Sequence, residues 1–215
     1  MRYQYVIFDL DNTLYPKESG LLNQVDRQID QFINRKLGIP ESKIPKLRNE
    51  YWKKYGTTLG GVVACHRTDP EEYINYTYNV KVSDYLKPDP ALVKVLSELK
   101  MKKAVFSNSP LKYVEEVLEV LQIRGFFEKI FDIHFCNYLG KPNHSSYFKV
   151  LADLGVDGKE CLFIDDTPVN VLGGEEAGMA SILLGSALTH NIKWSISDLT
   201  ELPSLIPKIQ DQLTA

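Results

Sequence analysis

The chain has 215 residues, 44% of them hydrophobic and 25% charged, and a formal net charge of −3 at pH 7. This length and composition are typical of a globular protein with a sizeable core, and they exclude a disordered chain. Because 25 basic residues stand against 28 acidic ones, the charge gives no indication of a nucleic-acid polymer or an anionic membrane surface as a partner.

The first predicted element is a buried strand over Tyr3–Phe8, an apolar run of the kind found in parallel sheets. The segment from Pro16 to Pro88 then contains no convincing strand. Its apolar residues recur at helical spacing from Leu22 to Leu37 and again from Leu47 to Tyr55, and Asp69-Pro70 is typical of a further helix start. We therefore predict an all-helical cap domain over residues 16–88, inserted after the first strand.

Beyond this insert, apolar runs alternate with stretches of helical periodicity. The remaining strands are predicted at Lys103–Phe106, Ile130–Phe135, Glu160–Ile164 and Ala180–Leu184. Helices are predicted to begin at Asp89-Pro90, at Ser109-Pro110 and near Ser145, and a last one over Ser197–Leu213. Strands that alternate with helices form parallel sheets. The predicted fold class is therefore α/β, with a Rossmann-like core of about five strands and helices on both faces, formed by residues 1–15 and 89–215.

The cysteines and the apolar runs bear on the cellular compartment. Cys65, Cys136 and Cys161 are odd in number and include no C-x-x-C pair, so neither a disulfide framework nor a zinc site is expected. No apolar stretch approaches the length of a membrane span, and no signal peptide is expected because Met1–Gln4 runs directly into the first strand. We therefore expect a cytoplasmic protein with reduced thiols and no membrane partner.

Polar side chains follow the carboxyl ends of the predicted strands, either directly or, for one lysine, a few residues later. They are Asp9, Asp11, Ser107, Asn108, Lys141, Asp165 and Asp166. Ligands of parallel α/β sheets bind outside the carboxyl ends of the strands. We therefore expect these side chains to gather at one edge of the sheet.

This set of side chains suits phosphate-ester chemistry. Crowded carboxylates repel one another unless a cation neutralises them, and Mg²⁺ prefers such oxygen ligands together with substrate phosphate. Asp9 can attack phosphorus to form an aspartyl phosphate, while Asp11 can protonate the leaving oxygen and later take a proton from water. Ser107 can donate a hydrogen bond to the phosphoryl oxygens, and Lys141 can balance their negative charge. The sequence therefore predicts a Mg²⁺-dependent phosphomonoester hydrolase.

The order Asp9-x-Asp11-x-Thr13, Ser107-Asn108, Lys141-Pro142 and Asp165-Asp166 resembles the four motifs of the haloacid dehalogenase superfamily, from Tyr5 to about Gly185. The resemblance implies that Asp9 is the nucleophile and Asp11 the acid and base. It implies that Mg²⁺ is held by the Asp11 backbone carbonyl and the Asp9 and Asp166 side chains, with Asp165 as an indirect or additional ligand. It also implies that the helical insert is a cap that excludes water and selects the substrate.

Three stretches look like the pyrimidine 5′-nucleotidase branch of that superfamily, namely Phe8–Pro16, Tyr55–Gly61 and Phe163–Asn170. This closer resemblance implies a nucleoside 5′-monophosphate, preferably a pyrimidine one, as the substrate. Ser107 stands where the branch usually has threonine, and the hydroxyl is retained. The predicted substrate-binding residues are Ser107, Asn108, Lys141, Thr57 and Thr58.

Other interpretations remain open for the same residues. The partner is a small phosphorylated metabolite, but a phosphatase or phosphomutase of a small sugar phosphate would use the same nucleophile. A carbon–halogen hydrolase is disfavoured because it needs no acid such as Asp11, and a vestigial binding protein is disfavoured by the complete motif set. Ser109 can be merely the N-cap of its helix and Lys141 a surface lysine, and no histidine is assigned a catalytic role.

Overall fold

The computed structural model describes residues 3–185 and 191–212, and in them a six-stranded parallel sheet has the order β3-β2-β1-β4-β5-β6. The strands are β1 (Tyr5–Phe8), β2 (Lys102–Phe106), β3 (Lys129–Phe131), β4 (Cys161–Asp165), β5 (Ala180–Leu184) and β6 (Trp194–Ile196). The predicted Rossmann-like α/β fold is thereby confirmed. The sixth strand adds one to the expected five, and its three residues are too few to give a periodic signal.

The strand β3 is shorter than the predicted run of Ile130–Phe135. It ends before Asp132, whose side chain accepts hydrogen bonds from the backbone N–H of Phe135 at 2.9 Å and from that of Leu111 at 2.9 Å. These bonds turn the chain away from the sheet. Ile133 is still buried, so the apolar run continues in the core but not in the strand.

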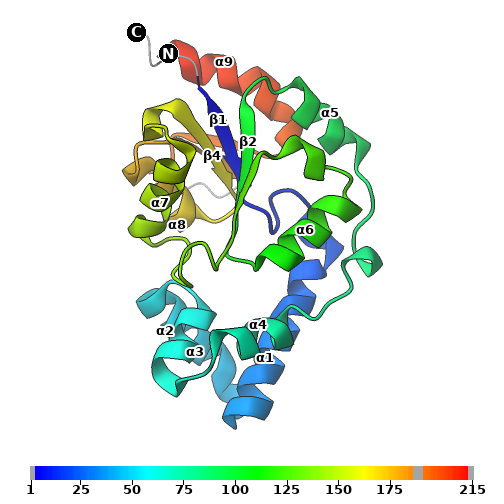
Figure 1. Cartoon of the computed structure of the whole chain (residues 1–215), viewed down its shortest axis with the longest axis vertical. Helices are drawn as coiled ribbons and strands as arrows, with labels where there is room; N and C mark the ends of the chain where they lie inside the picture. Colours follow the sequence, from blue (N-terminus) through cyan, green and yellow to red (C-terminus); the bar gives the residue numbers. More distant parts are fainter. Residues whose placement is uncertain (1–2, 186–190, 213–215) are drawn as a thin grey trace.

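Helices cover both faces of the sheet (Figure 1). They are α5 (Pro90–Glu98), α6 (Leu111–Val120), α7 (His144–Leu154), α8 (Pro168–Glu176) and α9 (Leu202–Gln212). In β1, Val6 and Phe8 belong to the apolar cluster that includes α5, α6 and α9, whereas Tyr5 and Ile7 belong to the cluster on the α7 and α8 side. Because successive strand residues point to opposite faces, β1 is buried on both sides.

The insert between β1 and α5 contains the helices α1 (Leu21–Leu37), α2 (Ile44–Tyr55), α3 (Thr58–His66) and α4 (Pro70–Thr77), named the cap helices here for their predicted role. They lie beyond the carboxyl ends of the strands, at the bottom of Figure 1. The predicted helices over 22–37 and 47–55 and the start at Asp69-Pro70 are confirmed, and Asp69 accepts a capping hydrogen bond from Glu71 N. The helix α3 was not predicted, because its sequence TLGGVVACH is apolar all round and contains two glycines.

The helix α3 packs closely against α2 at a glycine. A Cβ placed on Gly61 would lie 2.1 Å from Cγ of Tyr51, far inside contact distance. We expect Gly61→Ala to lower the free energy of unfolding by about 1–3 kcal/mol, because the Tyr51 ring must leave its packed position. Urea unfolding followed by circular dichroism measures this. The control Gly125→Ala meets no atom within 4 Å and should change stability by less than about 0.5 kcal/mol; equal effects of the two variants would contradict the packing argument.

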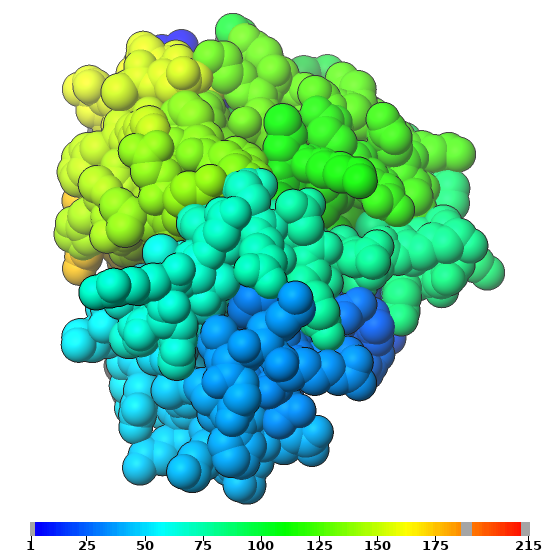
Figure 2. Space-filling view, turned by 60° about the horizontal axis from the view of Figure 1, so that its bottom comes forward, coloured from blue at the N-terminus to red at the C-terminus, as the bar shows by residue number. Residues whose placement is uncertain are grey.

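The cap helices contact the core directly, and in Figure 2 their blue to turquoise surface abuts the green and yellow-green surface of the core. Glu71 of α4 accepts a hydrogen bond from the Tyr138 hydroxyl at 2.9 Å and pairs with Nε2 of His134 at 2.9 Å. Val82 N donates to the Glu116 carboxylate of α6 at 3.2 Å.

Within residues 3–185 and 191–212, no helix has the length and apolarity to cross a membrane.

Candidate active site

The first two candidate residues follow β1 without a gap. Asp9 continues the ladder of β1, because its N–H donates to the carbonyl of Ile164 in β4 at 2.9 Å. The chain then turns at Asn12, which has a φ of 59° in the left-handed region that asparagine tolerates. Leu14 N donates back to the Leu10 carbonyl at 2.9 Å and closes the turn. The turn holds Asp9 and Asp11 at the carboxyl edge of the sheet.

Lys141 reaches this edge from the loop between β3 and α7. Its side chain is only 1% exposed, and Nζ donates to Oδ1 of Asp9 at 2.6 Å and to Oδ2 of Asp165 at 2.7 Å. The rings of Phe106 and Phe163 lie near the ammonium, with centroids 5.1 Å and 5.5 Å away. Buried cations require such partners. The structure therefore places the predicted lysine between two predicted carboxylates and not at the surface.

The peptide of Lys141 is held by Asn108. Its side-chain amide donates to the Lys141 carbonyl at 2.8 Å and accepts from the Lys141 N–H at 2.7 Å. Gly140 permits this close approach, since a Cβ there would lie 2.4 Å from Oδ1 of Asn108 and its φ is +57°. Both ends of the amide are thus engaged by the protein. Asn108 orients the lysine loop, and its role in binding substrate stays a prediction.

Burial and charge oppose each other in the pair of Asp9 and Lys141. Burial raises the pKa of Asp9 well above its usual value; Lys141 counteracts this, while Asp165 and Asp11 add to it. Burial by itself lowers the pKa of Lys141, but the carboxylates of Asp165 and Asp9 outweigh it and leave that pKa above its usual value. The lysine therefore remains a cation and compensates the negative charge beside it.

Asp165 is fully buried and accepts hydrogen bonds at both oxygens. Besides Lys141, the donors are the backbone N–H of Thr167 at 2.8 Å and the amide of Asn170 at 3.1 Å to each oxygen. Sequence reasoning missed Asn170, because an asparagine in the first turn of α8 gives no signal of its own. Asp165 is therefore suited to orient Lys141, whereas its neighbour Asp166 is only partly buried.

The side chains of Asp9, Asp165 and Asp166 each offer an oxygen, and these oxygens lie within 4.8 Å of one another. Burial first, and then the charge of Asp165, raises the pKa of Asp166 above its usual value. Carboxylate oxygens are the ligands that Mg²⁺ prefers, and clustered carboxylates gain stability from a divalent cation. The donor set therefore fits the predicted magnesium ion, and the assignment of Asp9 and Asp166 as its side-chain ligands stays a prediction.

The remaining predicted residues lie on different elements, one after β2 and two at the start of α3. Ser107 is fully buried at the end of β2, and its hydroxyl accepts from the N–H of Ser109 at 3.0 Å. Thr57 is the N-cap of α3, and its hydroxyl accepts from Gly60 N at 2.9 Å. Thr58 begins the same helix and is buried. The structure thus places both threonines in the cap helices and not in the acidic cluster.

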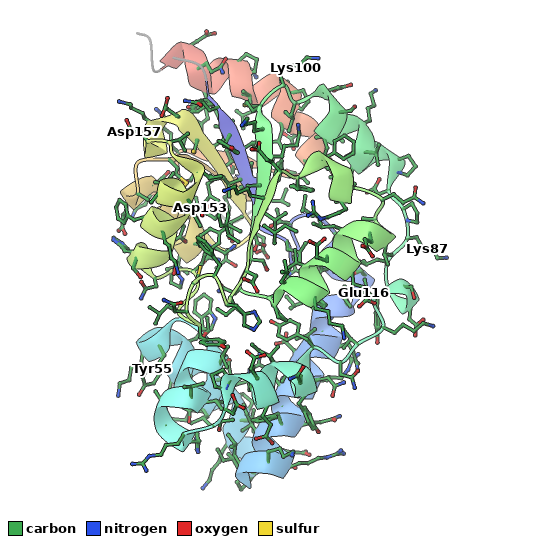
Figure 3. The ribbon with its side chains drawn as sticks, in the orientation of Figure 1. Tyr55, Lys87, Lys100, Glu116, Asp153 and Asp157 are labelled. Atoms are coloured by element: carbon green, nitrogen blue, oxygen red, sulfur yellow. The ribbon has the colours of Figure 1, made fainter. Side chains whose placement is uncertain are left out.

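The turn just before these threonines contacts the loop that carries Lys141. A Cβ on Gly56, which has a φ of +79°, would lie 3.5 Å from Cδ of Pro142 and 4.0 Å from the Lys141 carbonyl. Tyr55, the last residue of α2 and labelled in Figure 3, lines a cavity together with Tyr138 and Pro142 of the core. The segment around Thr57 therefore contacts the loop that carries Lys141.

The surroundings of Asp11 correct the interpretation of Ser109 as a helix cap. The helix α6 begins at Leu111 with Pro110 as its N-cap, and Ser109 Oγ instead donates to Oδ2 of Asp11 at 2.6 Å. Tyr15 and Tyr113 donate to Oδ1 of Asp11, the latter at 3.0 Å. No sequence spacing signals these contacts, because Tyr113 and Ser109 are about a hundred residues from Asp11 in the chain.

Comparison with known proteins identifies relatives over most of the chain. A family model for haloacid dehalogenase-like hydrolase matches residues 3–178. A phosphoglycolate phosphatase of Aquifex aeolicus is 27% identical to this chain, and the match covers 96% of this chain and 96% of that protein. The phosphate metabolism protein 8 of Saccharomyces cerevisiae is 26% identical over 82% of this chain, and the chain spans 60% of that relative's length.

Solved structures with the same arrangement of elements also exist. A haloacid dehalogenase-superfamily phosphatase of Thermococcus onnurineus superposes with a TM-score of 0.65 at 19% identity, over 96% of this chain and 98% of its own. The L-2-haloacid dehalogenase of Xanthobacter autotrophicus gives a TM-score of 0.63 at 17% identity, over 95% and 98%. At these identities the likeness shows the shared fold.

Proposed function

We propose that the chain, which belongs to the haloacid dehalogenase-like hydrolases, is a phosphatase of small phosphorylated substrates and hydrolyses phosphate monoesters through an aspartyl phosphate on Asp9. One observation carries the proposal. The ammonium of Lys141 is buried between Asp9 and Asp165, and an oxygen of Asp166 lies within 4.8 Å of theirs. This arrangement provides a nucleophile, a fixed cation and a place for a divalent ion side by side.

The proposed reaction has two displacements at phosphorus. A carboxylate oxygen of Asp9 forms a bond to phosphorus as the ester P–O bond breaks, and Asp11 gives its proton to the departing ester oxygen. Water then attacks the same phosphorus, Asp11 takes the proton of that water, and the Asp9–phosphorus bond breaks. Lys141 and Ser107 hold the phosphoryl oxygens during both displacements.

We propose that Asp9, Asp166 and the backbone carbonyl of Asp11 hold Mg²⁺, with Asp165 acting indirectly through Lys141. When bound, the ion supplies positive charge that draws the phosphate dianion toward the Asp9 carboxylate. The chain's own contribution is to aim Asp9, since Lys141 holds one of its oxygens and places a positive charge beside it.

We further propose that residues 16–88 act as a cap domain over a core formed by residues 1–15 and 89–215. Contacts such as that of Glu71 with Tyr138 connect the two parts. A cap that closes over the carboxyl edge would exclude water while phosphate transfers to Asp9.

For the substrate we propose a nucleoside 5′-monophosphate, with a pyrimidine base preferred. The segment Tyr55–Gly61, on which the nucleotidase resemblance partly rests, contacts the lysine loop through Gly56 and Pro142, and this supports a role in recognition. A small sugar phosphate is the second candidate. It is favoured by relatives named as phosphatases of phosphoglycolate and of glyceraldehyde 3-phosphate.

A phosphate-release screen tests these proposals. The purified protein would be assayed on nucleoside monophosphates, sugar phosphates and p-nitrophenyl phosphate, each with Mg²⁺ and with excess EDTA. We expect release to fall at least about 100-fold in EDTA and to return when Mg²⁺ is restored, because the acidic cluster then regains its counter-charge. Equal release under both conditions would contradict the metal, and a preference for sugar phosphates would contradict the nucleotide. Isomerised substrate with little free phosphate would indicate a mutase.

A further inference from the structure

The carboxylate of Asp11 is enclosed by hydroxyl groups. Tyr15 and Tyr113 both donate to Oδ1, and Ser109 donates to Oδ2 at 2.6 Å. All three donors are buried, with 3%, 3% and 1% of their surface exposed. Three hydrogen bonds to one carboxylate are more than a helix cap or a simple turn requires.

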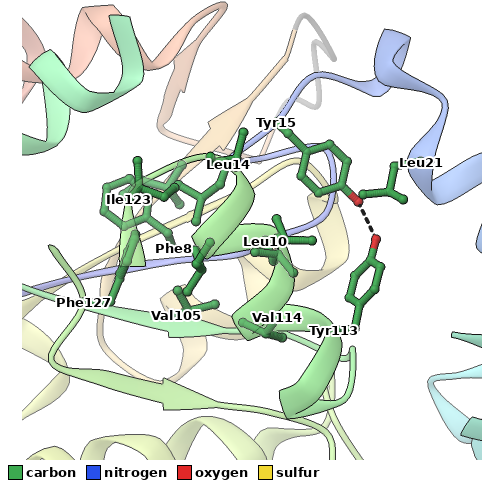
Figure 4. Close-up of a cluster of buried hydrophobic side chains, with 14 of the residues drawn as sticks. Phe8, Leu10, Leu14, Tyr15, Leu21, Val105, Tyr113, Val114, Ile123 and Phe127 are labelled. Carbon is green, nitrogen blue, oxygen red and sulfur yellow. Dashed lines mark hydrogen bonds between the residues drawn. The ribbon is translucent and has the colours of Figure 1, made fainter. Parts of the chain in front are cut away.

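The two tyrosine rings are held in place by packing. Their hydroxyl oxygens lie 3.0 Å apart. Tyr15 packs in the apolar cluster with Leu10 and Leu21, and Figure 4 shows the two tyrosines with their hydroxyls facing each other. The ring of Tyr113 meets that of Tyr78 edge to face, with centroids 5.1 Å apart. Buried rings held in this way have little freedom to move. The Oδ1 side of Asp11 is therefore anchored to the core.

The two oxygens of Asp11 consequently differ. An ionised carboxylate only accepts hydrogen bonds, whereas a protonated one must donate its single hydrogen. Oδ1 already accepts from two rigid donors, Tyr15 and Tyr113, so the oxygen that can carry the proton is Oδ2.

Ser109 can adapt to either state of Oδ2. Its hydroxyl has one hydrogen and two acceptors within reach, Oδ2 of Asp11 at 2.6 Å and the Tyr78 hydroxyl at 3.3 Å. When Oδ2 is ionised, the serine donates to it. When Oδ2 carries a proton, rotation about the serine Cβ–Oγ bond lets the hydroxyl donate to Tyr78 instead. Tyr78 directly follows α4, so the acceptor for this second state comes from the cap side.

We propose that Tyr15, Tyr113 and Ser109 are positioning residues for the acid of the reaction, an inference that rests on the proposed function. The tyrosines anchor Oδ1, and Oδ2 gives its proton to the ester oxygen as the P–O bond breaks and the electron pair of that bond goes to the same oxygen. Ser109 then turns to the carboxylate that remains. In the second displacement Oδ2 takes a proton from the attacking water, and Ser109 returns to Tyr78.

A comparison of leaving groups tests this assignment. Phenyl phosphate and p-nitrophenyl phosphate differ little in shape, but p-nitrophenolate leaves readily without a proton and phenolate does not. For Tyr15→Phe and Tyr113→Phe we expect kcat/KM to fall at least about 10-fold on phenyl phosphate and less than about twofold on the p-nitrophenyl ester, since a placed acid contributes roughly 10²–10⁴-fold. The ratio kcat/KM is used because it reports the steps through the first phosphoryl transfer.

Matched variants keep the result interpretable. Tyr51→Phe removes a hydroxyl that bonds to His66 in the cap and should leave both esters unchanged. If a Tyr15 or Tyr113 variant does not fold, Ser109→Ala replaces it and should show the same selective loss. Equal losses on the two esters, or no loss on either, would overturn the positioning role. Full activity of Asp9→Asn would instead overturn the proposed function, so the two failures are distinct.

Discussion

Asp9→Asn should reduce phosphate release at least about 10³-fold on every substrate that the native protein accepts, because an amide cannot form the aspartyl phosphate. Asparagine keeps the shape of the side chain and a carbonyl oxygen that can still accept from Lys141. The fold should therefore survive, and a thermal melt would show this. The measurement is phosphate release with Mg²⁺ present, at saturating substrate.

Two further observations make this test specific. In the native protein, a phosphate label from substrate should remain on the acid-quenched chain and be removed by hydroxylamine, and Asp9→Asn should carry none. Asp153→Asn is the matched control, because Asp153 pairs with Lys129 at the surface at 2.6 Å and should leave activity unchanged. Retained activity or a retained label in the Asp9 variant would refute the nucleophile.

Lys141→Met should be costly for stability as well as for activity. The substitution keeps an unbranched side chain of nearly the same length but leaves the buried carboxylates of Asp9 and Asp165 without their cation. Removing one partner of a buried ion pair costs about 3–5 kcal/mol, and we expect the free energy of unfolding in urea to fall by that amount. Phosphate release should be lost in parallel, because nothing then balances the phosphoryl oxygens.

A double-mutant cycle identifies the cause. Asp165→Asn removes one of the two negative charges. The double variant Lys141→Met with Asp165→Asn should therefore lose less free energy of unfolding than the two single variants lose in total. Lys129→Met removes an exposed lysine and should leave the free energy of unfolding nearly unchanged. Additive single effects, or a Lys141 variant as stable as the native protein, would contradict the account of charge compensation.

The residues at strand ends were predictable from the sequence for a topological reason. Asp9 directly follows β1 and Asp165 is the last residue of β4, and these strands are neighbours in the sheet with Phe8 opposite Ile164. In a parallel sheet, neighbouring strands that both lead into acidic residues must bring those residues to one edge. The acidic cluster therefore follows from the order of strands and helices alone.

Contacts made by loops and by rings were not predictable in that way. Whether Lys141 is a surface residue or a buried one depends on the path of its loop, which Asn108 holds from another strand end. Tyr15 and Tyr113 appear in the sequence only as apolar residues of a turn and a helix, and nothing in their spacing indicates that both hydroxyls reach Asp11. Such contacts arise from packing at long sequence separation, for which local periodicity gives no signal.

The place of β1 in the middle of the sheet has a consequence for biosynthesis. Tyr5 pairs with Lys102 on one side and with Cys161 on the other, so both neighbours of the first strand leave the ribosome long after it. Until then its two hydrogen-bonding edges are open, and such edges favour pairing with other chains. Folding that waits for distant partners is slow. The nascent chain therefore keeps one edge of β1 exposed until β2 has emerged and the other until β4 has emerged.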